Sequence, residues 1–295
     1  MVFLSARSRG LVRPALAAAL LVGSAVQPRQ AAAHEFWLES SPAPAAPGDT
    51  VGVQAVVGTG FRGELKPYAK TRTVRLQLRT TRDIDLIPVA VNGDLAYARF
   101  ILPDGGGALV SYESNFVPIE IPAARFETYL RTEGLDAAQA ARQARGDRGP
   151  GRERYARCAK TWIAGTDAAR LLQPAGLDLE IVPLADPLAA SNVTCQVLFH
   201  GRPLAQALVR AWRCAVIGTT AVGRDSVPPV CGDRTDSTGT TTLAATGPGQ
   251  WLLSTVHMIP STDPSADWQS VWASFTFTRP APPAASGRPK TRAGK

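Results

Sequence analysis

The chain has 295 residues, of which 45% are hydrophobic and 19% are charged, so it can form a buried core and is not an intrinsically disordered protein. Its length corresponds to about two domains at the usual 100–200 residues per domain. The net charge of +8 comes from the two ends of the chain. Residues 1–33 carry four arginines and residues 279–295 carry five basic side chains, with no acidic residue in either segment, whereas the residues between them carry 23 basic and 24 acidic side chains. This near-neutral body lacks the basic surface expected of a nucleic-acid-binding protein.

Residues 1–33 have the three parts of a secretory signal peptide. Three arginines precede an apolar stretch at residues 15–26, and residues 31–33 (AAA) form a small-residue cleavage site. The apolar stretch is too short to span a bilayer as a helix, and no later segment reaches 18 apolar residues. We therefore expect an exported, periplasmic protein that has no transmembrane segment after cleavage before His34.

Short segments of alternating or continuous apolar residues follow, separated by turn-forming residues. They predict strands at residues 35–39, 51–57, 74–78, 95–102 and 108–112. Short strands at this spacing are typical of a β-sandwich. We interpret residues 34–122 as an N-terminal β-domain.

The periodicity changes after residue 122. Phe126, Tyr129 and Leu130 have the i, i+3, i+4 spacing of a helix, and residues 155–162 repeat this spacing. The sequence therefore predicts a helical hairpin insert over residues 123–165.

A second series of strands follows the expected hairpin. They are predicted at residues 179–182, 194–199, 207–212, 240–244, 251–256 and 272–278. Their order resembles that of the immunoglobulin-like or prealbumin-like sandwiches of exported bacterial proteins, which predicts a C-terminal β-sandwich over residues 177–278. Residues 279–295 are rich in proline, alanine and basic residues and are expected to be a disordered tail. The predicted fold class is mainly β, with two β-sandwich domains and the helical hairpin between them.

The four cysteines are Cys158, Cys195, Cys214 and Cys231. Disulfide bonds form readily in exported proteins, and four cysteines allow three pairings. We favour a Cys214–Cys231 disulfide bond, because it would close the polar segment between these residues. Cys158 and Cys195 would then remain as a second pair.

After cleavage the chain would contain three histidines, His34, His200 and His257, and a single methionine, Met258. A histidine at the first position offers its α-amino nitrogen and its own Nδ1 to one metal ion. The amine titrates near about 7.7–8.0, so it can lose its proton to a metal at neutral pH. One further imidazole would complete a three-nitrogen site, which suits copper, nickel or cobalt.

His257 is the first candidate for that further imidazole, because it ends a predicted strand beside an irregular segment. Met258 and Asp267 are candidate helper ligands. The alternative is that His257 is a hydrogen-bonded residue without a ligand role, and that His200 is an exposed turn residue. The HExxH, GxSxG and phosphate-loop motifs of common enzymes are absent, so no catalytic residue is predicted.

Residues 33–39 (AHEFWLE), directly after the signal peptide, resemble the start of the domain-of-unknown-function 4198 (DUF4198) family. Further matching motifs, in chain order, are residues 126–130 (FETYL) with 133–135 (EGL), 152–160 (RERYARCAK), 179–187 (LEIVPLADP), 201–204 (GRPL), 247–252 (GPGQWL), His257-Met258 and 267–274 (DWQSVWAS). The resemblance implies an exported bacterial protein associated with nickel or cobalt uptake, with His34 and His257 in the positions of the family's histidines. A separate cobalt/nickel permease is the partner that this role implies.

Three functions follow as hypotheses. The first is a periplasmic protein that binds nickel or cobalt, or copper, and is accessory to metal uptake. The second is a non-enzymatic tandem β-sandwich module that binds a partner protein or a glycan. The third is a copper enzyme that uses an N-terminal histidine clamp.

Overall fold

The computed structural model describes residues 35–105, 107–163, 168–189, 191–215 and 224–281. The predicted signal peptide, His34 and the end of the predicted tail, residues 282–295, lie outside these ranges. Within them the chain is mainly β, with 50% strand and 9% helix, as the sequence predicts. The described helices include none that is long and apolar enough to cross a membrane.

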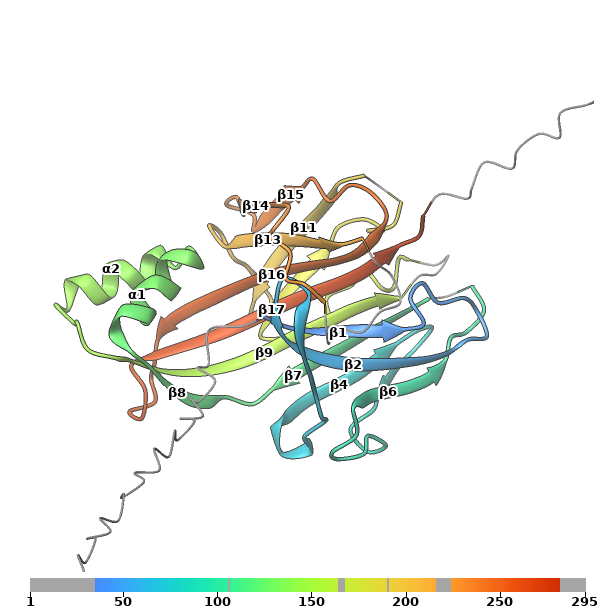
Figure 1. Cartoon of the computed structure of the whole chain (residues 1–295), viewed down its shortest axis with the longest axis horizontal. Helices are drawn as coiled ribbons and strands as arrows, with labels where there is room; N and C mark the ends of the chain where they lie inside the picture. The colour runs from blue at the N-terminus through green and yellow to red at the C-terminus, as the bar shows by residue number, and fades with distance from the viewer. Residues whose placement is uncertain (1–34, 106, 164–167, 190, 216–223, 282–295) are drawn as a thin grey trace, which may run out of the picture. The chain divides into compact units, whose positions relative to one another are not determined.

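A nine-stranded sheet is the centre of the fold (Figure 1). Its strands are β4 (Thr73–Arg79), β5 (Asp83–Asp85), β7 (Ala108–Ser114), β8 (Val117–Ile121), β9 (Gly151–Ile163), β13 (Leu208–Cys214), β14 (Cys231–Arg234), β16 (Gly249–Pro260) and β17 (Trp268–Arg279). The order is β14-β13-β16-β17-β9-β7-β4-β5, and β8 pairs with β9 beyond the end of β7. All of these pairs are antiparallel except β17 with β9, which is parallel.

Two four-stranded sheets flank the central sheet. One contains β1 (Glu35–Ser41), β2 (Thr50–Thr59), β3 (Arg62–Lys66) and β6 (Ala96–Ile101), and the other contains β10 (Leu179–Pro183), β11 (Val193–Phe199), β12 (Arg202–Pro203) and β15 (Thr240–Leu243). Along β9, Cys158 and Trp162 pack in the same core cluster as β10 and β11, whereas Ala159 and Ile163 pack in the cluster that contains β1 and β2. Because successive side chains of a strand point to opposite faces, the two small sheets cover opposite faces of the central sheet.

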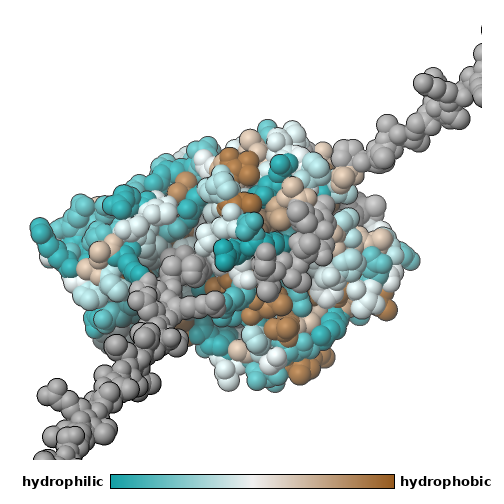
Figure 2. Space-filling view, in the orientation of Figure 1, coloured by the Kyte–Doolittle hydropathy of each residue, from teal (hydrophilic) through white to brown (hydrophobic). Residues whose placement is uncertain are grey.

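Two helices, α1 (Ala123–Thr132) and α2 (Asp136–Ala144), lie between β8 and β9 in the chain, and a 3₁₀ turn (Lys70–Arg72) precedes β4. The helices pack on the same face as β1. Phe126 and Leu130 are fully buried against Trp268 and Trp272 of β17, and the Tyr129 ring stacks on Trp272 at 5.7 Å. Over the helices the surface in Figure 2 is largely hydrophilic, as expected of amphipathic helices with one buried face.

The predicted helical hairpin over residues 123–165 is correct in its first half and wrong in its second. Residues 151–163 form the long strand β9 rather than a helix. The spacing that suggested a helix is ambiguous, because residues four apart lie on one face of a strand as well as on one face of a helix. Cys158 and Trp162 share the core on one face of β9, and Ala159 and Ile163 share the core on the other.

The segments predicted as two β-domains, residues 34–122 and 177–278, contribute strands to the same central sheet. β4 and β7 come from the first segment, β13, β16 and β17 from the second, and β9 joins them. Residue 279, the first residue of the predicted tail, belongs to the central sheet instead. Arg279 is the last residue of β17, is buried, and donates hydrogen bonds to the carbonyl oxygen of Pro187 at 2.6 and 2.8 Å.

None of the four cysteines forms a disulfide bond, so the predicted Cys214–Cys231 disulfide bond is absent. The strand register explains why. Cys231 on β14 lies opposite Ala211 on β13, three residues before Cys214. Three residues of strand span about 10 Å, whereas the Cα atoms of a disulfide bond lie about 4.4–6.8 Å apart. Cys158 and Cys195 are buried as thiols in the core between β9 and β11.

Candidate functional site

The first described residue, Glu35, begins β1 and is only 4% exposed. β1 pairs with β2, and Glu35 lies opposite Gly58. The strand also packs on the central sheet, where Thr276 of β17 donates a hydrogen bond to the carbonyl oxygen of Leu38 at 2.6 Å. Covered in this way, the first four residues of β1 are all buried, although their sequence includes a glutamate.

The carboxyl group of Glu35 is incompletely satisfied. Its own backbone amide and the Thr59 side chain donate hydrogen bonds to it, yet Oε2 is buried and has no hydrogen-bond partner among the described residues. Burial raises the pKa of Glu35 to about 7; the negative charge of Glu133 adds to this rise and the positive charge of Arg210 reduces it. Glu35 can therefore lose its proton near neutral pH, but its charge lacks full compensation there.

Glu133 and Arg210 form a close ion pair beside Glu35. Glu133 is the C-cap residue directly after α1, and Arg210 lies on β13 with its guanidinium 5.3 Å from the Trp212 ring centroid. Burial raises the pKa of Glu133, although Arg210 opposes the rise. One guanidinium thus faces two buried carboxyl groups, which leaves the group of three with a net negative charge when both are ionised.

Glu39, four residues further along β1, differs from Glu35 because its carboxyl group has side-chain partners. It accepts a hydrogen bond from Trp37 Nε1 at 2.8 Å and forms an ion pair with Arg224 at 3.0 Å. Glu39 therefore has partners that account for its burial, whereas Glu35 Oε2 has none in the described part of the chain.

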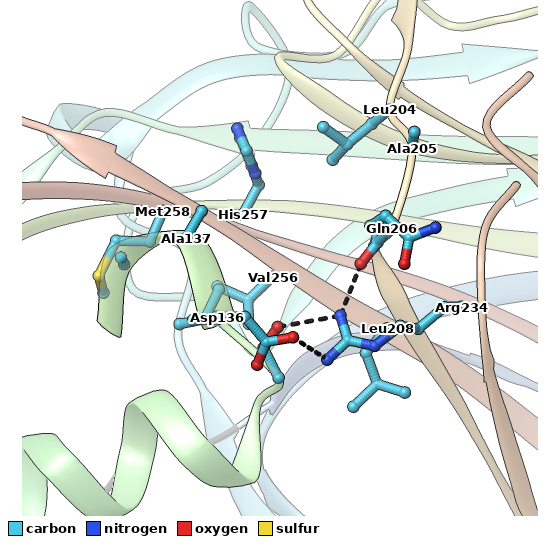
Figure 3. A pocket seen from close by; sticks show the side chains of 14 residues that line it. Asp136, Ala137, Leu204, Ala205, Gln206, Leu208, Arg234, Val256, His257 and Met258 are labelled. Atoms are coloured by element: carbon cyan, nitrogen blue, oxygen red, sulfur yellow. Dashed lines mark hydrogen bonds and ion pairs between the residues drawn. The ribbon is translucent and has the colours of Figure 1, made fainter. Parts of the chain in front are cut away.

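The structure separates three of the residues predicted as metal ligands. Met258 is buried against the helices and Trp272, and Asp267 forms an ion pair with Arg152 at 2.7 Å. His257 is adjacent to Met258 on β16 and so points to the other face of the sheet, where its ring lies 4.6 Å from that of Phe199. Figure 3 shows the two side chains leaving β16 in different directions.

His257 has a neighbour that sequence reasoning assigned only to a turn. The ring of His200 also contacts Phe199, with 4.0 Å between the ring centroids. Burial lowers the pKa of His257, and the nearby charge of His200 lowers it further. His200 in turn lies beside Asp178, with 3.3 Å between Nδ1 and Oδ1.

A pocket of about 120 Å³ lies next to His257 (Figure 3). Its lining includes Val256, the segment 204–208 and the beginning of α2. Arg234 closes one side through a 2.7 Å ion pair with Asp136. The pocket occurs where β16 extends beyond the start of β13, because Leu208 is the first residue of β13.

The described residues contain no group of three or more His, Cys, Asp or Glu side chains arranged to hold a metal ion. A metal site at the start of β1 would thus need a ligand from outside these ranges, and His34 directly precedes Glu35 in the sequence.

A model of a protein family, the domain of unknown function DUF4198, matches residues 31–259. The chain belongs to the DUF4198 family. This confirms the family that the motifs indicated. A search of curated proteins finds no match.

The DUF4198 match includes both groups of residues described above, since Glu35, Glu133, His200, Arg210 and His257 all lie within residues 31–259. It ends before Asp267 and before β17. The family description states no function, so the function has to be argued from the side chains.

Proposed function

We propose that this DUF4198 protein is exported to the periplasm and binds a transition metal ion, nickel or cobalt or else copper, at the start of β1. The role is accessory to metal uptake, with a cobalt/nickel permease as the partner. The observation that carries this proposal is the buried Oε2 of Glu35, which has no hydrogen-bond partner in the described part of the chain. The two sheets are proposed to pack on the central sheet as sandwiches of the immunoglobulin-like or prealbumin-like type.

The donor set fits a divalent transition metal ion. His34 would provide its α-amino nitrogen and Nδ1 after cleavage, and Glu35 would provide Oε2. Mixed nitrogen and oxygen ligands suit nickel, cobalt and copper. A divalent cation would also compensate the negative charge of Glu35 and Glu133, which Arg210 alone does not balance.

The proposed ligands do not include His257, which the sequence analysis put forward as the second histidine of the site. Arg210, which acts on Glu35, and Val209 are neighbours on β13, and Val209 packs in the same core as β11. Arg210 therefore faces the β1 side of the sheet, whereas His257 contacts Phe199 of β11 on the other side. Met258 and Asp267 are left out because their side chains already have the contacts described above.

The test is a metal titration by calorimetry on secreted protein whose first residue is confirmed by intact mass. One version begins at His34, and a second retains Ala33, which moves the α-amine away from the histidine. We expect nickel or cobalt to bind the first version at one equivalent and the second at least tenfold more weakly, about 1.4 kcal/mol.

Two substitutions in the version that begins at His34 locate the site on β1. Glu35→Gln should weaken binding at least tenfold, because the amide is a poorer ligand than the carboxylate. Glu39→Gln is the matched control on the same strand and should leave the affinity unchanged. Equal binding by the His34 and Ala33 versions, or by Glu35→Gln and the unsubstituted protein, would refute the proposal and direct attention to a protein or glycan partner.

A further inference from the structure

Strand β16 has one edge that is only partly paired. All 12 of its residues pair with β17, whereas its other edge pairs with β13 only as far as Ser254. Alternate residues of an antiparallel strand direct both their N–H and C=O groups to the same neighbour. Within residues 255–260, the groups directed away from β17 have no backbone partner in the described part of the chain. This stretch is an open position for a further strand.

The pocket beside His257 opens along this unpaired edge. Three consecutive residues of β16, residues 256–258, line it. Because successive side chains of a strand point to opposite faces, one pocket can touch all three residues only along the edge of the strand. The segment 204–208 forms the opposite wall, and the first turn of α2 adds a third. The pocket therefore lies where a strand added to β16 would run.

The segment 204–208 is held away from β16 by its own contacts. The amide of Gln206 donates to the carbonyl oxygen of Thr235 at 2.9 Å. Gln206 has a φ of 63°, in the left-handed region that a residue other than glycine seldom occupies. Arg234 joins the two walls, because its guanidinium donates to the carbonyl oxygens of Gln206 and Gly134 at 2.7 and 3.2 Å (Figure 3). The gap beside β16 is therefore built into the fold.

The size and charge of the pocket indicate what it can hold. Its volume of about 120 Å³ is somewhat less than the roughly 150 Å³ of a cavity that binds benzene, so it can take one aliphatic side chain. Its charged residues, Arg234 and Asp136, pair with each other at 2.7 Å. Burial lowers the pKa of His257, so this imidazole is mainly neutral at pH 7. Most other lining residues are alanine, leucine, valine or methionine, and an uncharged occupant complements such a lining.

We propose that an extended, uncharged segment of a partner protein adds as a short strand to the edge of β16 at residues 255–260 and inserts one aliphatic side chain into the pocket. Backbone hydrogen bonds to β16 supply the affinity and the inserted side chain supplies the specificity, as in other cases of strand addition. The added strand continues the line of β13 along β16, so it extends a pairing that the sheet already contains. This interaction does not depend on the metal site proposed at β1.

The test uses the secreted protein without added metal and a blocked peptide, acetyl-Thr-Leu-Thr-amide, whose threonines favour an extended backbone. ¹H–¹⁵N NMR follows a titration into the millimolar range. We expect the amide signals of residues 205–208 and 256–259 to shift. The peptide with alanine in place of leucine should bind at least tenfold more weakly, because it leaves the pocket empty. The leucine peptide with every backbone nitrogen methylated should not bind, because it cannot donate to β16.

Two variants on α2 test the place of binding. Ala137 is exposed and lines the pocket, so Ala137→Leu should fill it and weaken binding of the leucine peptide at least tenfold. Ala140 is exposed on the same helix outside the pocket lining, and Ala140→Leu is the matched control that should bind normally. Both residue types favour helices, and circular dichroism shows whether each variant is folded.

Absence of binding, equal binding of the leucine and alanine peptides, or binding that survives methylation would overturn the proposal. So would unchanged affinity in folded Ala137→Leu. Sedimentation velocity tests a different occupant. A dimer that dissociates in Ala137→Leu but not in Ala140→Leu would show that a second copy of the chain fills the pocket, which would also overturn the proposal.

Discussion

Two buried glutamates, Glu35 on β1 and Glu180 on β10, occupy opposite sides of the central sheet and differ in what surrounds their oxygens. Glu180 accepts a hydrogen bond from Lys160 Nζ at 2.6 Å and further bonds from the backbone amides of residues 175 and 176 at 2.6 and 2.9 Å. Burial opposes its ionisation, but Lys160 and these amides hold its pKa below the usual value. Burial raises the pKa of Glu35 to about 7 instead.

The difference separates a structural carboxylate from a candidate ligand. The partners of Glu180 come from β9 and from the segment before β10, so the residue fixes that segment to the sheet. Glu35 has no equivalent for its Oε2 among the described residues. A buried polar atom without a partner costs about 1–3 kcal/mol, and such a cost in a folded protein calls for a compensating role.

The largest effect expected is from Lys160→Met. Both Lys160 and Glu180 are 1% exposed, so removal of the ammonium leaves a buried carboxylate without its counter-charge. We expect the free energy of unfolding to fall by about 3–5 kcal/mol, measured by urea denaturation at pH 7. The double variant Lys160→Met, Glu180→Gln should recover part of this loss. A loss below about 1 kcal/mol in Lys160→Met would mean that the backbone amides alone hold the carboxylate.

The next largest effect is on the pH dependence of the free energy of unfolding. Glu153 of β9 contributes to this dependence. Glu153 is 3% exposed and accepts a hydrogen bond from Tyr129, and burial raises its pKa from 4.5 to about 7. Between these values the folded state binds more protons than the unfolded state, so the free energy of unfolding falls as pH rises from about 4.5 to 7. The contribution is of the order of 3 kcal/mol.

Urea denaturation of the metal-free protein at pH 5 and pH 8 measures this change. Glu153→Gln should reduce the difference by the contribution of this one residue, because the amide does not titrate. The remaining difference comes in part from Glu35 and Glu113, whose pKa values burial also raises to about 7. Equal pH dependence with and without the substitution would show that Glu153 is already ionised at pH 5.

A smaller effect compares the two glutamates directly. In metal-free protein at pH 8, Glu180→Gln should destabilise, because Lys160 loses its counter-charge, whereas Glu35→Gln should change the free energy of unfolding by less than about 1 kcal/mol or increase it, because it removes an incompletely compensated charge. Thermal melts of both variants test the contrast. A strong destabilisation by Glu35→Gln would mean that Glu35 is a structural residue.

The smallest effect concerns the thiols. A disulfide bond contributes about 2–4 kcal/mol, so a protein that contained one would melt at a lower temperature after reduction. Because none of the four cysteines forms a disulfide bond, reducing agent should leave the melting temperature unchanged. Alkylation under denaturing conditions without reductant should label all four cysteines, and fewer than four labels would contradict the structure.

The sequence was most informative about strands with local apolar patterns. The strand predicted at residues 51–57 lies within β2, and that predicted at 272–278 lies within β17. The sequence led to the wrong prediction for β9, because spacings of four residues fit a helix and a strand equally well. The parallel pairing of β17 with β9 joins segments more than 100 residues apart, and no local pattern specifies it.

For the candidate sites too, the sequence indicated single residues but not the contacts that depend on the fold. His34 and His257 were found because histidines are scarce, but sequence could not show that His257 has His200 as its neighbour. The group of Glu35, Glu133 and Arg210 depends on three distant segments meeting in the fold. One local signal could have indicated it: Glu35 precedes the apolar residues Phe36, Trp37 and Leu38, which are all buried, so a charged residue beside them is a candidate for burial.

The position of β17 in the sheet has a consequence for how the chain acquires its structure. β17 is the last strand of the described residues, yet it lies between β16 and β9 in the middle of the sheet. A nascent chain that ends before Trp268 has no strand to join its two halves, and both β16 and β9 present unpaired edges. Folding can therefore finish only after almost the whole chain has left the ribosome, because long-range pairing has to wait for its partner.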